Sequence, residues 1–446
     1  MKKVLILGAG LVVKPMVSYL LQHGFQITLA SSTPKRAKEM ILEHPNGVVV
    51  DWTMDEDARL DEMVMNHDLT VSMLPYVFHV QVARKCLKHK KDMVTASYVK
   101  PEMQALNEEA VNAGIIILNE MGLDPGIDHM SAMRIIDHIH TKGGKVEEFY
   151  SLCGALPAPE AATNPFRYKF SWSPKGVVMA GNNDARYLRN GKVVEIPTEK
   201  LFSNPFKVDF DTIGELDVYP NRDSISYKDI YGIPESKTVF RGTFRYPGWC
   251  ETMDAMKRLG LFSYEKYHLE GMNHADLMAL LIGSIKTENI KEQVAHWLGV
   301  DIGTHAIKAL EWLGLFSDQM MDRKVESPFE IVSDLMIQKM ELGTEERDMV
   351  ALQHIFLASY PDGTEEVIRS RMLDFGTLAT DTSIARTVGL PAAIGVELIL
   401  NGQIGVKGVV RPTIPEIYNP VLERLKELGV KMVEEYGLPL SENILF

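Results

Sequence analysis

The segment richest in potential chemistry is residues 122–176, where the motifs GLDPGIDH, CGALPAPE, NPFRYKFSW and SPKG follow one another. Proline and glycine in these motifs favour tight turns. Titratable and aromatic side chains stand beside them, and such groups bind and process charged small molecules. We therefore expect one wall of a ligand site here. The side chains concerned are Asp124, Asp128, His129, Cys153, Glu160, Arg167, Lys169 and Trp172.

A dinucleotide-binding pattern stands at the start of the chain. Gly8 and Gly10 follow the apolar run KKVLIL and precede a segment with helical periodicity. Such glycines allow a tight turn and let the backbone approach a pyrophosphate at a helix N-terminus. We expect Leu11 and Val12 to open that helix and to contact the cofactor. Val13 replaces the third glycine of the usual pattern, so a sheet domain that has lost its cofactor is the alternative.

The tip of the second expected strand indicates which dinucleotide is bound. NAD sites commonly have Asp or Glu about 20 residues after the glycines. This chain has Ser31–Thr33 there, followed by Lys35 and Arg36. Hydroxyl groups and cations suit a 2′-phosphate, so the pattern favours NADP. The alternative is that the two cations only begin a solvated helix face.

Further candidate cofactor contacts end the next strands. Asp51 ends the third expected strand and suits a polar contact near the adenine. Leu74 and Pro75 end the fourth and suit packing beside the dinucleotide at the carboxyl edge of the sheet.

The elements that must position these residues alternate between strand and helix over the first 120 residues. Apolar runs typical of buried parallel strands recur between helical segments. This alternation predicts an α/β fold with a doubly wound, Rossmann-type parallel sheet. The expected strands are 2–7, 25–30, 47–50, 69–74, 92–97 and 114–120, and the expected helices are 13–23 and 34–43.

The pattern changes after residue 120, where strand-like and helical segments predict a mixed α/β domain with a helical insertion. The strand-like segments are 145–153, 177–181, 191–196, 238–246 and 347–357. The expected division is a dinucleotide-binding domain of 1–125 and 380–446, a substrate-binding α/β domain of 126–250 and 346–379, and a small helical domain of 251–345.

Composition narrows the class of protein. The 446 residues are 46% hydrophobic and 24% charged, which is typical of a soluble protein of two or three domains. A net charge of −13 argues against nucleic acid or an anionic membrane as main partner. No apolar run reaches the roughly 18–20 residues of a membrane span. Three scattered cysteines argue against a disulfide framework or a zinc site, so we expect a reducing compartment, the cytoplasm or an organelle matrix.

Long ungapped motifs carry a family resemblance along nearly the whole chain. They are GAGxxxxP at 8–15, SMLPYVFH at 72–79, VTASYV at 94–99, GLDPGIDH at 122–129, CGALPAPE at 153–160, YKFSW at 168–172, YPNRDS at 219–224, RGTFRY at 241–246 and TVGLPAAI at 387–394. With them the chain resembles the glutamate-forming saccharopine dehydrogenases.

The resemblance implies an activity, a fold and a partner. The reaction is saccharopine + NAD(P)+ + water ⇌ glutamate + 2-aminoadipate 6-semialdehyde + NAD(P)H, a step of lysine metabolism. The implied protein is a three-domain homodimer, with the α/β substrate domain also serving dimerisation. NADP-using relatives carry Arg at the tip of the second strand and NAD-using animal relatives carry Asp. This chain has Ser32 and Thr33 there, so NAD stays the alternative to NADP.

The resemblance also implies site residues. Ser97, Tyr98, Asp124 and Arg222 are implied contacts of saccharopine, and Ser173 lies near the cofactor. Saccharopine carries three carboxylates and a secondary amine, so its site needs fixed cations, for which arginine forks are well suited. For each cation a structural salt bridge is the alternative. The remaining candidates are Lys169, Arg241, Thr243 and Arg245.

Three side chains are candidates for moving protons at the amine and the carbinolamine: Tyr98, Asp124 and Cys153. For Cys153 the alternative is a small buried residue beside Gly154. His129 is interpreted as a polar support of its turn, because no second cluster has the spacing of metal ligands. No metal is expected, and His79 stays ambiguous.

Two other functions compete with this hypothesis. One is a related amino-acid dehydrogenase acting on another imine, which YPNRDS and RGTFRY disfavour because they suit a substrate with several carboxylates. The other is a catalytically silent dinucleotide sensor. The joint presence of Tyr98, Asp124, Cys153 and Arg222 disfavours it.

Overall fold

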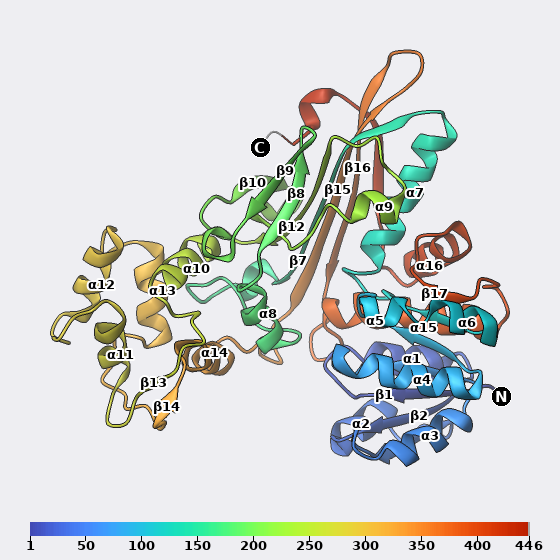
Figure 1. Cartoon of the computed structure of the whole chain (residues 1–446), viewed down its shortest axis with the longest axis horizontal. Coiled ribbons are helices and arrows are strands. Elements are labelled where there is room, and N and C mark those ends of the chain that lie inside the picture. The colour runs from blue at the N-terminus through green and yellow to red at the C-terminus, as the bar shows by residue number, and fades with distance from the viewer. Residues whose placement is uncertain (445–446) are drawn as a thin grey trace. The chain divides into compact units, whose positions relative to one another are not determined.

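The computed structural model describes residues 1–444, which form two compact units. Unit 1 contains residues 1–146, 229–233 and 356–442. Unit 2 contains residues 147–228 and 234–355, together with residues 443–444. Figure 1 shows the chain coloured from its N-terminus to its C-terminus and labels many of the elements of both units. The division into three domains stays a prediction.

The main sheet of unit 1 is parallel and doubly wound, which confirms the predicted fold class. Its strand order is β17-β6-β5-β4-β1-β2-β3, so the winding reverses between β1 and β4. Runs such as VLIL in β1 are fully buried because helices cover both faces. The strands are β1 Lys3–Leu7, β2 Gln26–Ser31, β3 Gly47–Asp51, β4 Leu69–Ser72, β5 Asp92–Thr95, β6 Ile116–Leu118 and β17 Gly408–Val410.

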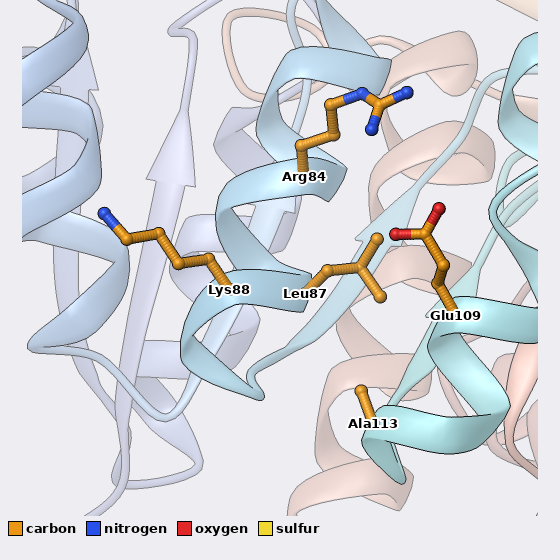
Figure 2. A pocket seen from close by; sticks show the side chains of 5 residues that line it. All are labelled: Arg84, Leu87, Lys88, Glu109 and Ala113. Carbon is orange, nitrogen blue, oxygen red and sulfur yellow. The ribbon is translucent and has the colours of Figure 1, made fainter.

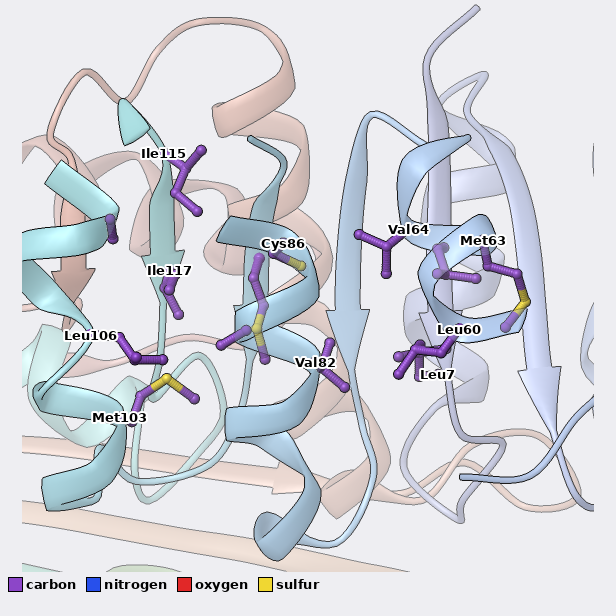
Figure 3. Close-up of a cluster of buried hydrophobic side chains, with 14 of the residues drawn as sticks. Leu7, Leu60, Met63, Val64, Val82, Cys86, Met103, Leu106, Ile115 and Ile117 are labelled. Carbon is purple, nitrogen blue, oxygen red and sulfur yellow. The ribbon is translucent and has the colours of Figure 1, made fainter. Parts of the chain in front are cut away.

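Side chains alternate between the two faces of this sheet. Leu5 and Leu7 of β1 belong to a buried cluster with apolar residues of α3, α4, α5 and α6, which Figure 3 shows. Burying one such leucine stabilises the fold by about 1.5–3 kcal/mol. Helices α1 and α15 pack together, as do α7 and α16. The helices of unit 1 are α1 Lys14–Gln22, α2 Pro34–Ile41, α3 Asp57–Met65, α4 His79–His89, α5 Pro101–Gln104, α6 Asn107–Ala113, α7 Ile127–Thr141, α15 Ser383–Leu400 and α16 Pro415–Glu427.

Helix α15 corrects one expectation from the sequence. By length and composition it could cross a membrane, although no segment of that length was expected. However, 78% of it is buried inside the protein, as in the core helix of a globular fold. Gly389 lets it approach α1 closely, because a Cβ there would lie 2.8 Å from the Val12 carbonyl oxygen and 3.2 Å from the Met16 nitrogen.

The sheet of unit 2 is mixed, as predicted. Its strands run in the order β10-β11-β12-β7-β15, and β8 pairs with both β12 and β9. β7 and β12 are parallel, whereas β11 is antiparallel to β10 and β12. In unit 1, β16 and β18 form an antiparallel pair. The strands are β7 Lys145–Pro157, β8 Ala185–Arg189, β9 Lys192–Ile196, β10 Phe206–Phe210, β11 Gly214–Pro220, β12 Thr238–Arg245, β15 Asp348–Ser359, β16 Glu365–Phe375 and β18 Val433–Leu438.

Helices dominate residues 251–345 of unit 2, as predicted, with one short strand pair among them. The strand predicted at 177–181 is wrong, because these residues belong mainly to helix α8. Ser173 precedes that helix and Pro174 lies in its first turn, positions that both residue types favour. The elements are α8 Pro174–Ala180, α9 Tyr227–Tyr231, α10 Trp249–Arg258, β13 Tyr267–His268, α11 His274–Leu281, α12 Ile290–Leu298, α13 His305–Leu313, β14 Val325–Glu326 and α14 Pro328–Lys339.

Candidate functional site

The predicted dinucleotide-binding residues of unit 1 gather at the carboxyl edge of its sheet, because β1 to β4 are parallel. Gly8 follows β1 with φ +101°, and its N–H donates to the Ala30 carbonyl at 2.8 Å. A Cβ on Gly8 would lie 2.9 Å from the Met73 carbonyl oxygen. Both its dihedral and its surroundings therefore require glycine.

The turn after Gly8 differs from the expected helix start. Residues 11–13 form a turn, and α1 begins at Lys14. The Val13 N–H donates to the Gly10 carbonyl at 3.3 Å, which closes this turn. Leu11 is half exposed and Val12 is partly buried. Val13 is buried, which explains why an apolar residue replaces the third glycine.

The tip of β2 presents hydroxyl groups beside a helix N-terminus. Ser31 Oγ lies 3.0 Å from Thr33 Oγ1 and accepts the Thr33 N–H at 3.1 Å. Ser32 and Thr33 are exposed, and α2 begins at Pro34. The first turn of α2 contains the exposed Arg36 and no acidic residue. The positive end of the helix dipole and a cation therefore lie together without a carboxylate in that turn.

The other predicted cofactor contacts end neighbouring strands, with one exception. Asp51 is the exposed last residue of β3. Leu74 and Pro75 follow β4, and Leu74 Cδ2 lies 3.6 Å from the position of a Cβ on Gly8. The exception is Ser173, which is exposed and belongs to unit 2.

The predicted substrate residues of unit 1 lie at the carboxyl ends of adjacent strands of the same sheet. Ser97 and Tyr98 follow β5, and Asp124 follows β6. The Tyr98 hydroxyl donates to Asp124 Oδ1 at 2.9 Å. All three are partly buried, so their polar atoms combine a fixed geometry with access from outside.

The same sheet edge contains a buried carboxylate, Glu120, that the sequence analysis did not single out. Glu120 Oε1 accepts the Val99 N–H at 2.8 Å and Arg411 Nε–H at 3.0 Å. Glu120 Oε2 lies 2.6 Å from His129 Nε2, and His129 Nδ1 lies 2.8 Å from the Tyr231 hydroxyl. Burial alone would raise the pKa of Glu120, but His129, Arg411 and the Val99 N–H together hold it below its usual value.

This geometry agrees with the interpretation of His129 as a support of its turn. Within residues 1–444, no group of three or more His, Cys, Asp or Glu side chains is arranged to hold a metal ion. Glu120 could not be recognised from local sequence, because its partner Arg411 lies 291 residues away.

In unit 2 the RGTFR motif places its polar residues on one face of β12. Arg241, Thr243 and Arg245 alternate along the strand and so project to the same side. Thr243 pairs with Cys153 of β7 and with Tyr219 of β11. Cys153 is buried and is not part of a disulfide.

Arg245 is enclosed by aromatic rings. Its guanidinium carbon lies 4.8 Å from the Tyr168 ring centre, 5.3 Å from Trp249 and 5.9 Å from Tyr219. The residue is 6% exposed, and its Nη1 donates to the Phe244 carbonyl at 2.8 Å. Among the described residues no carboxylate lies within ion-pair distance of it, and its buried Nε has no acceptor. A buried cation without a counter-charge is costly, which points to an anionic ligand.

The other predicted cations differ in their surroundings. Arg241 is buried, with its guanidinium 4.3 Å from the Tyr227 ring centre. Arg222 is exposed in a turn at φ +50°. Lys169 forms an ion pair with Glu346, which agrees with the structural alternative for this residue.

Two surface hollows of about 340 Å³ each are lined by none of the predicted site residues. Figure 2 shows one of them between α4 and α6, lined by Arg84, Leu87, Lys88, Glu109 and Ala113. Its residues come mainly from the C-terminal halves of these helices, which lie toward the amino edge of a parallel sheet. The second hollow is lined in part by Gln104, Arg411 and Thr413.

Comparison with known proteins gives two family models and several relatives. A model described as saccharopine dehydrogenase NADP binding domain matches residues 4–118, and one described as saccharopine dehydrogenase C-terminal domain matches residues 122–430. The chain is 36% identical to saccharopine dehydrogenase [NADP(+), L-glutamate-forming] of Saccharomyces cerevisiae, covering 99% of each protein.

Animal relatives are longer. The chain is 38% identical to the mitochondrial alpha-aminoadipic semialdehyde synthase of Mus musculus, covering 96% of this chain and 47% of that protein. It thus spans about half the length of such relatives. Among solved structures, apo saccharopine dehydrogenase (L-Glu forming) of S. cerevisiae superposes with a TM-score of 0.90 at 34% identity, covering 98% of this chain and all of the other.

Replacement of the buried carboxylate tests its structural role. Glu120→Gln keeps the shape but leaves Arg411 and His129 without their counter-charge, so we expect the free energy of unfolding to fall by about 3–5 kcal/mol. The matched control is Glu423→Gln, because Glu423 is exposed and lies 3.5 Å from Lys426. The control should cost less than about 1 kcal/mol. Urea unfolding followed by circular dichroism measures both values.

The difference in unfolding free energy between wild type and Glu120→Gln should also depend on pH, which gives a second readout. Because folding lowers the pKa of Glu120, its ionised form stabilises the protein above the unfolded pKa of about 4.3. That contribution is lost as the pH falls through the folded pKa. The gap between wild type and Glu120→Gln should therefore narrow below about pH 4. Equal costs for the two variants at neutral pH would contradict the assigned role.

Proposed function

Because the chain belongs to the saccharopine dehydrogenase family, we propose that it catalyses the glutamate-forming reaction of lysine metabolism. The reaction is saccharopine + NADP+ + water ⇌ L-glutamate + 2-aminoadipate 6-semialdehyde + NADPH. One observation carries the proposal: the Gly8 turn and the Tyr98–Asp124 pair share one edge of one sheet. A dinucleotide cradle beside a proton-handling pair suits the oxidation of an amine.

The residues of the carboxyl edge fit NADP. After the Gly8 turn, a Cβ on Gly10 would meet no atom of the surrounding protein within 4 Å, which leaves room for a pyrophosphate against the backbone. Ser31–Thr33 and Arg36 offer hydroxyl groups, a cation and a helix N-terminus to a 2′-phosphate, and the first turn of α2 contains no acidic residue to repel it. We therefore propose NADP rather than NAD. Bound NADP+ supplies the hydride acceptor.

The residues of the chain handle protons in this reaction. Loss of a hydride from the lysyl-side carbon and of a proton from the amine leaves an imine, to which water adds. Breakage of the carbon–nitrogen bond of the resulting carbinolamine releases glutamate and the aldehyde. Tyr98 and Asp124 are 2.9 Å apart and suited to move protons at the nitrogen and the water. Cys153 stays an alternative proton carrier.

The carboxylates of saccharopine account for the cations of unit 2. A carboxylate on Arg245 would supply the counter-charge that the described residues lack. We propose Arg222, Arg241 and Thr243 as further contacts. Lys169 is left out because Glu346 already neutralises it.

We also propose that the enzyme is a homodimer in a reducing compartment such as the cytoplasm. Cys86, Cys153 and Cys250 are all buried, and none of them is part of a disulfide. Burial raises the pKa of Cys86 to about 12 and also raises that of Cys250, so these two thiols are unreactive. Light scattering of the purified protein distinguishes a dimer from a monomer.

The activity is tested by the absorbance of reduced nicotinamide after saccharopine is mixed with the protein and either NADP+ or NAD+. We expect saccharopine-dependent reduction of both, with the larger kcat/KM for NADP+. Absence of turnover with either cofactor would refute the proposed reaction. A preference for NAD+ would refute only the cofactor assignment.

A matched pair of charge reversals tests how NADP is selected. Arg36 lies in the first turn of α2 and Lys38 in its last, so Arg36→Glu and Lys38→Glu change the net charge equally. We expect Arg36→Glu to raise KM for NADP+ roughly 10- to 100-fold through the loss of a charge-assisted hydrogen bond. KM for NAD+ should be unchanged. Equal effects of both variants would show a general field effect instead of a phosphate contact.

Arg245→Met separates ligand binding from folding. Methionine fills the aromatic enclosure without a charge, so we expect unfolding stability equal to or above that of wild type. Loss of the carboxylate contact should raise KM for saccharopine about 100-fold or more, corresponding to roughly 3 kcal/mol. The dissociation constant of NADPH, measured by its fluorescence, should not change. A destabilised variant with normal KM for saccharopine would give Arg245 a structural role.

A further inference from the structure

A buried imidazole lies behind Ser97. His79 begins α4, is 4% exposed, and lies between the ends of β4 and β5. Its Nδ1 lies 2.8 Å from Ser72 Oγ and its Nε2 lies 2.8 Å from Ser97 Oγ. Thr95 Oγ1 lies farther from Nε2, at 3.3 Å, and accepts the Ser97 N–H at 3.3 Å. Burial lowers the pKa of His79 to about 4, so the ring is neutral at neutral pH.

A neutral imidazole donates from one nitrogen and accepts at the other. With the proton on Nε2, Ser72 donates to Nδ1 and the ring donates to Ser97 Oγ. Only the hydroxyl proton of buried Thr95 then lacks an acceptor among the described residues. With the proton on Nδ1, the shorter contact of 2.8 Å, against 3.3 Å for Thr95, makes Ser97 the donor to Nε2, and the buried hydroxyl protons of both Ser72 and Thr95 then lack an acceptor. Each such loss costs about 1–3 kcal/mol, so the Nε2–H form is favoured.

We propose that His79 is a positioning residue that donates its Nε2–H to Ser97 and thereby directs the hydroxyl proton of Ser97 toward the ligand. In the Nδ1–H tautomer the Ser97 hydroxyl would donate its hydrogen bond to the ring, and only its lone pairs would be available to the ligand. His79, Ser72 and Thr95 are buried, whereas Ser97 is partly exposed. Of these four hydrogen-bonded residues, Ser97 is therefore the one that a ligand can reach.

The direction of this hydrogen bond defines the chemistry of the partner. A serine that presents its proton needs an acceptor, and an ionised carboxylate accepts at both oxygens and cannot donate. This step rests on the proposed function, in which the substrate carries three carboxylates. The structure thus assigns Ser97 as a donor to a substrate carboxylate, with its rotamer set from behind by His79.

The tautomer is testable on the free protein, whatever reaction it catalyses. Nitrogen NMR of protein with ¹⁵N-labelled histidine rings distinguishes the two tautomers and the imidazolium, and the signal lost in His79→Gln identifies His79. We expect a neutral ring with Nε2 protonated and no titration between about pH 8 and pH 6. A proton on Nδ1, or an imidazolium at neutral pH, would overturn the proposal.

Kinetics with saccharopine then test the consequence. His79→Leu removes the donor, whereas the amide of His79→Gln can present an N–H toward Ser97. We expect His79→Leu to raise KM for saccharopine roughly threefold to tenfold, the effect of one hydrogen bond, with the dissociation constant of NADPH unchanged. His79→Gln should recover most of this loss. In a Ser97→Ala background His79→Leu should have no further effect, and a full effect there would assign His79 to folding alone.

Discussion

The substrate side of the parallel sheet depends on one buried carboxylate. Glu120 binds the backbone after β5 through Val99, helix α7 through His129 and the end of β17 through Arg411. These three elements are far apart in the sequence. Without the shared carboxylate the buried His129 would lose this partner, and Arg411, which is 25% exposed, would lose its counter-charge. Tyr98 and Asp124 stand on the chain segments that Glu120 connects, so their 2.9 Å hydrogen bond rests on this arrangement.

The local charge at the proposed cofactor and substrate sites is opposite in sign to the net charge of the whole molecule. The protein has a net charge of −13, which repels an anionic substrate or cofactor at long range. Fixed positive groups attract these anions at short range. They are the first turn of α2 with Arg36, and Arg245 inside its aromatic rings. Aromatic faces favour a guanidinium without neutralising it, so its charge stays available to a carboxylate.

Much of the cofactor edge was predictable from sequence, because it depends on local patterns. Gly8 and Ser31–Thr33 each follow an apolar run whose end marks the sheet edge, and only the start of α1 was misplaced, by a few residues. The strand prediction for residues 177–181 was wrong because it rested on the β-branched pair Val177 and Val178, which favours strands. Ser173 and Pro174, which favour the start of a helix, precede them.

Long-range contacts were beyond such patterns. The partners of Glu120 and the rings around Arg245 come from distant segments. The role of His79 is ambiguous from sequence, because it depends on Ser72 and Ser97, which lie on either side of its ring.

The most direct test of the account is the identity of the products, because saccharopine has an oxidisable carbon on each side of its amine nitrogen. Mass spectrometry after reaction with NADP+ should find glutamate and 2-aminoadipate 6-semialdehyde; lysine and 2-oxoglutarate would contradict the account.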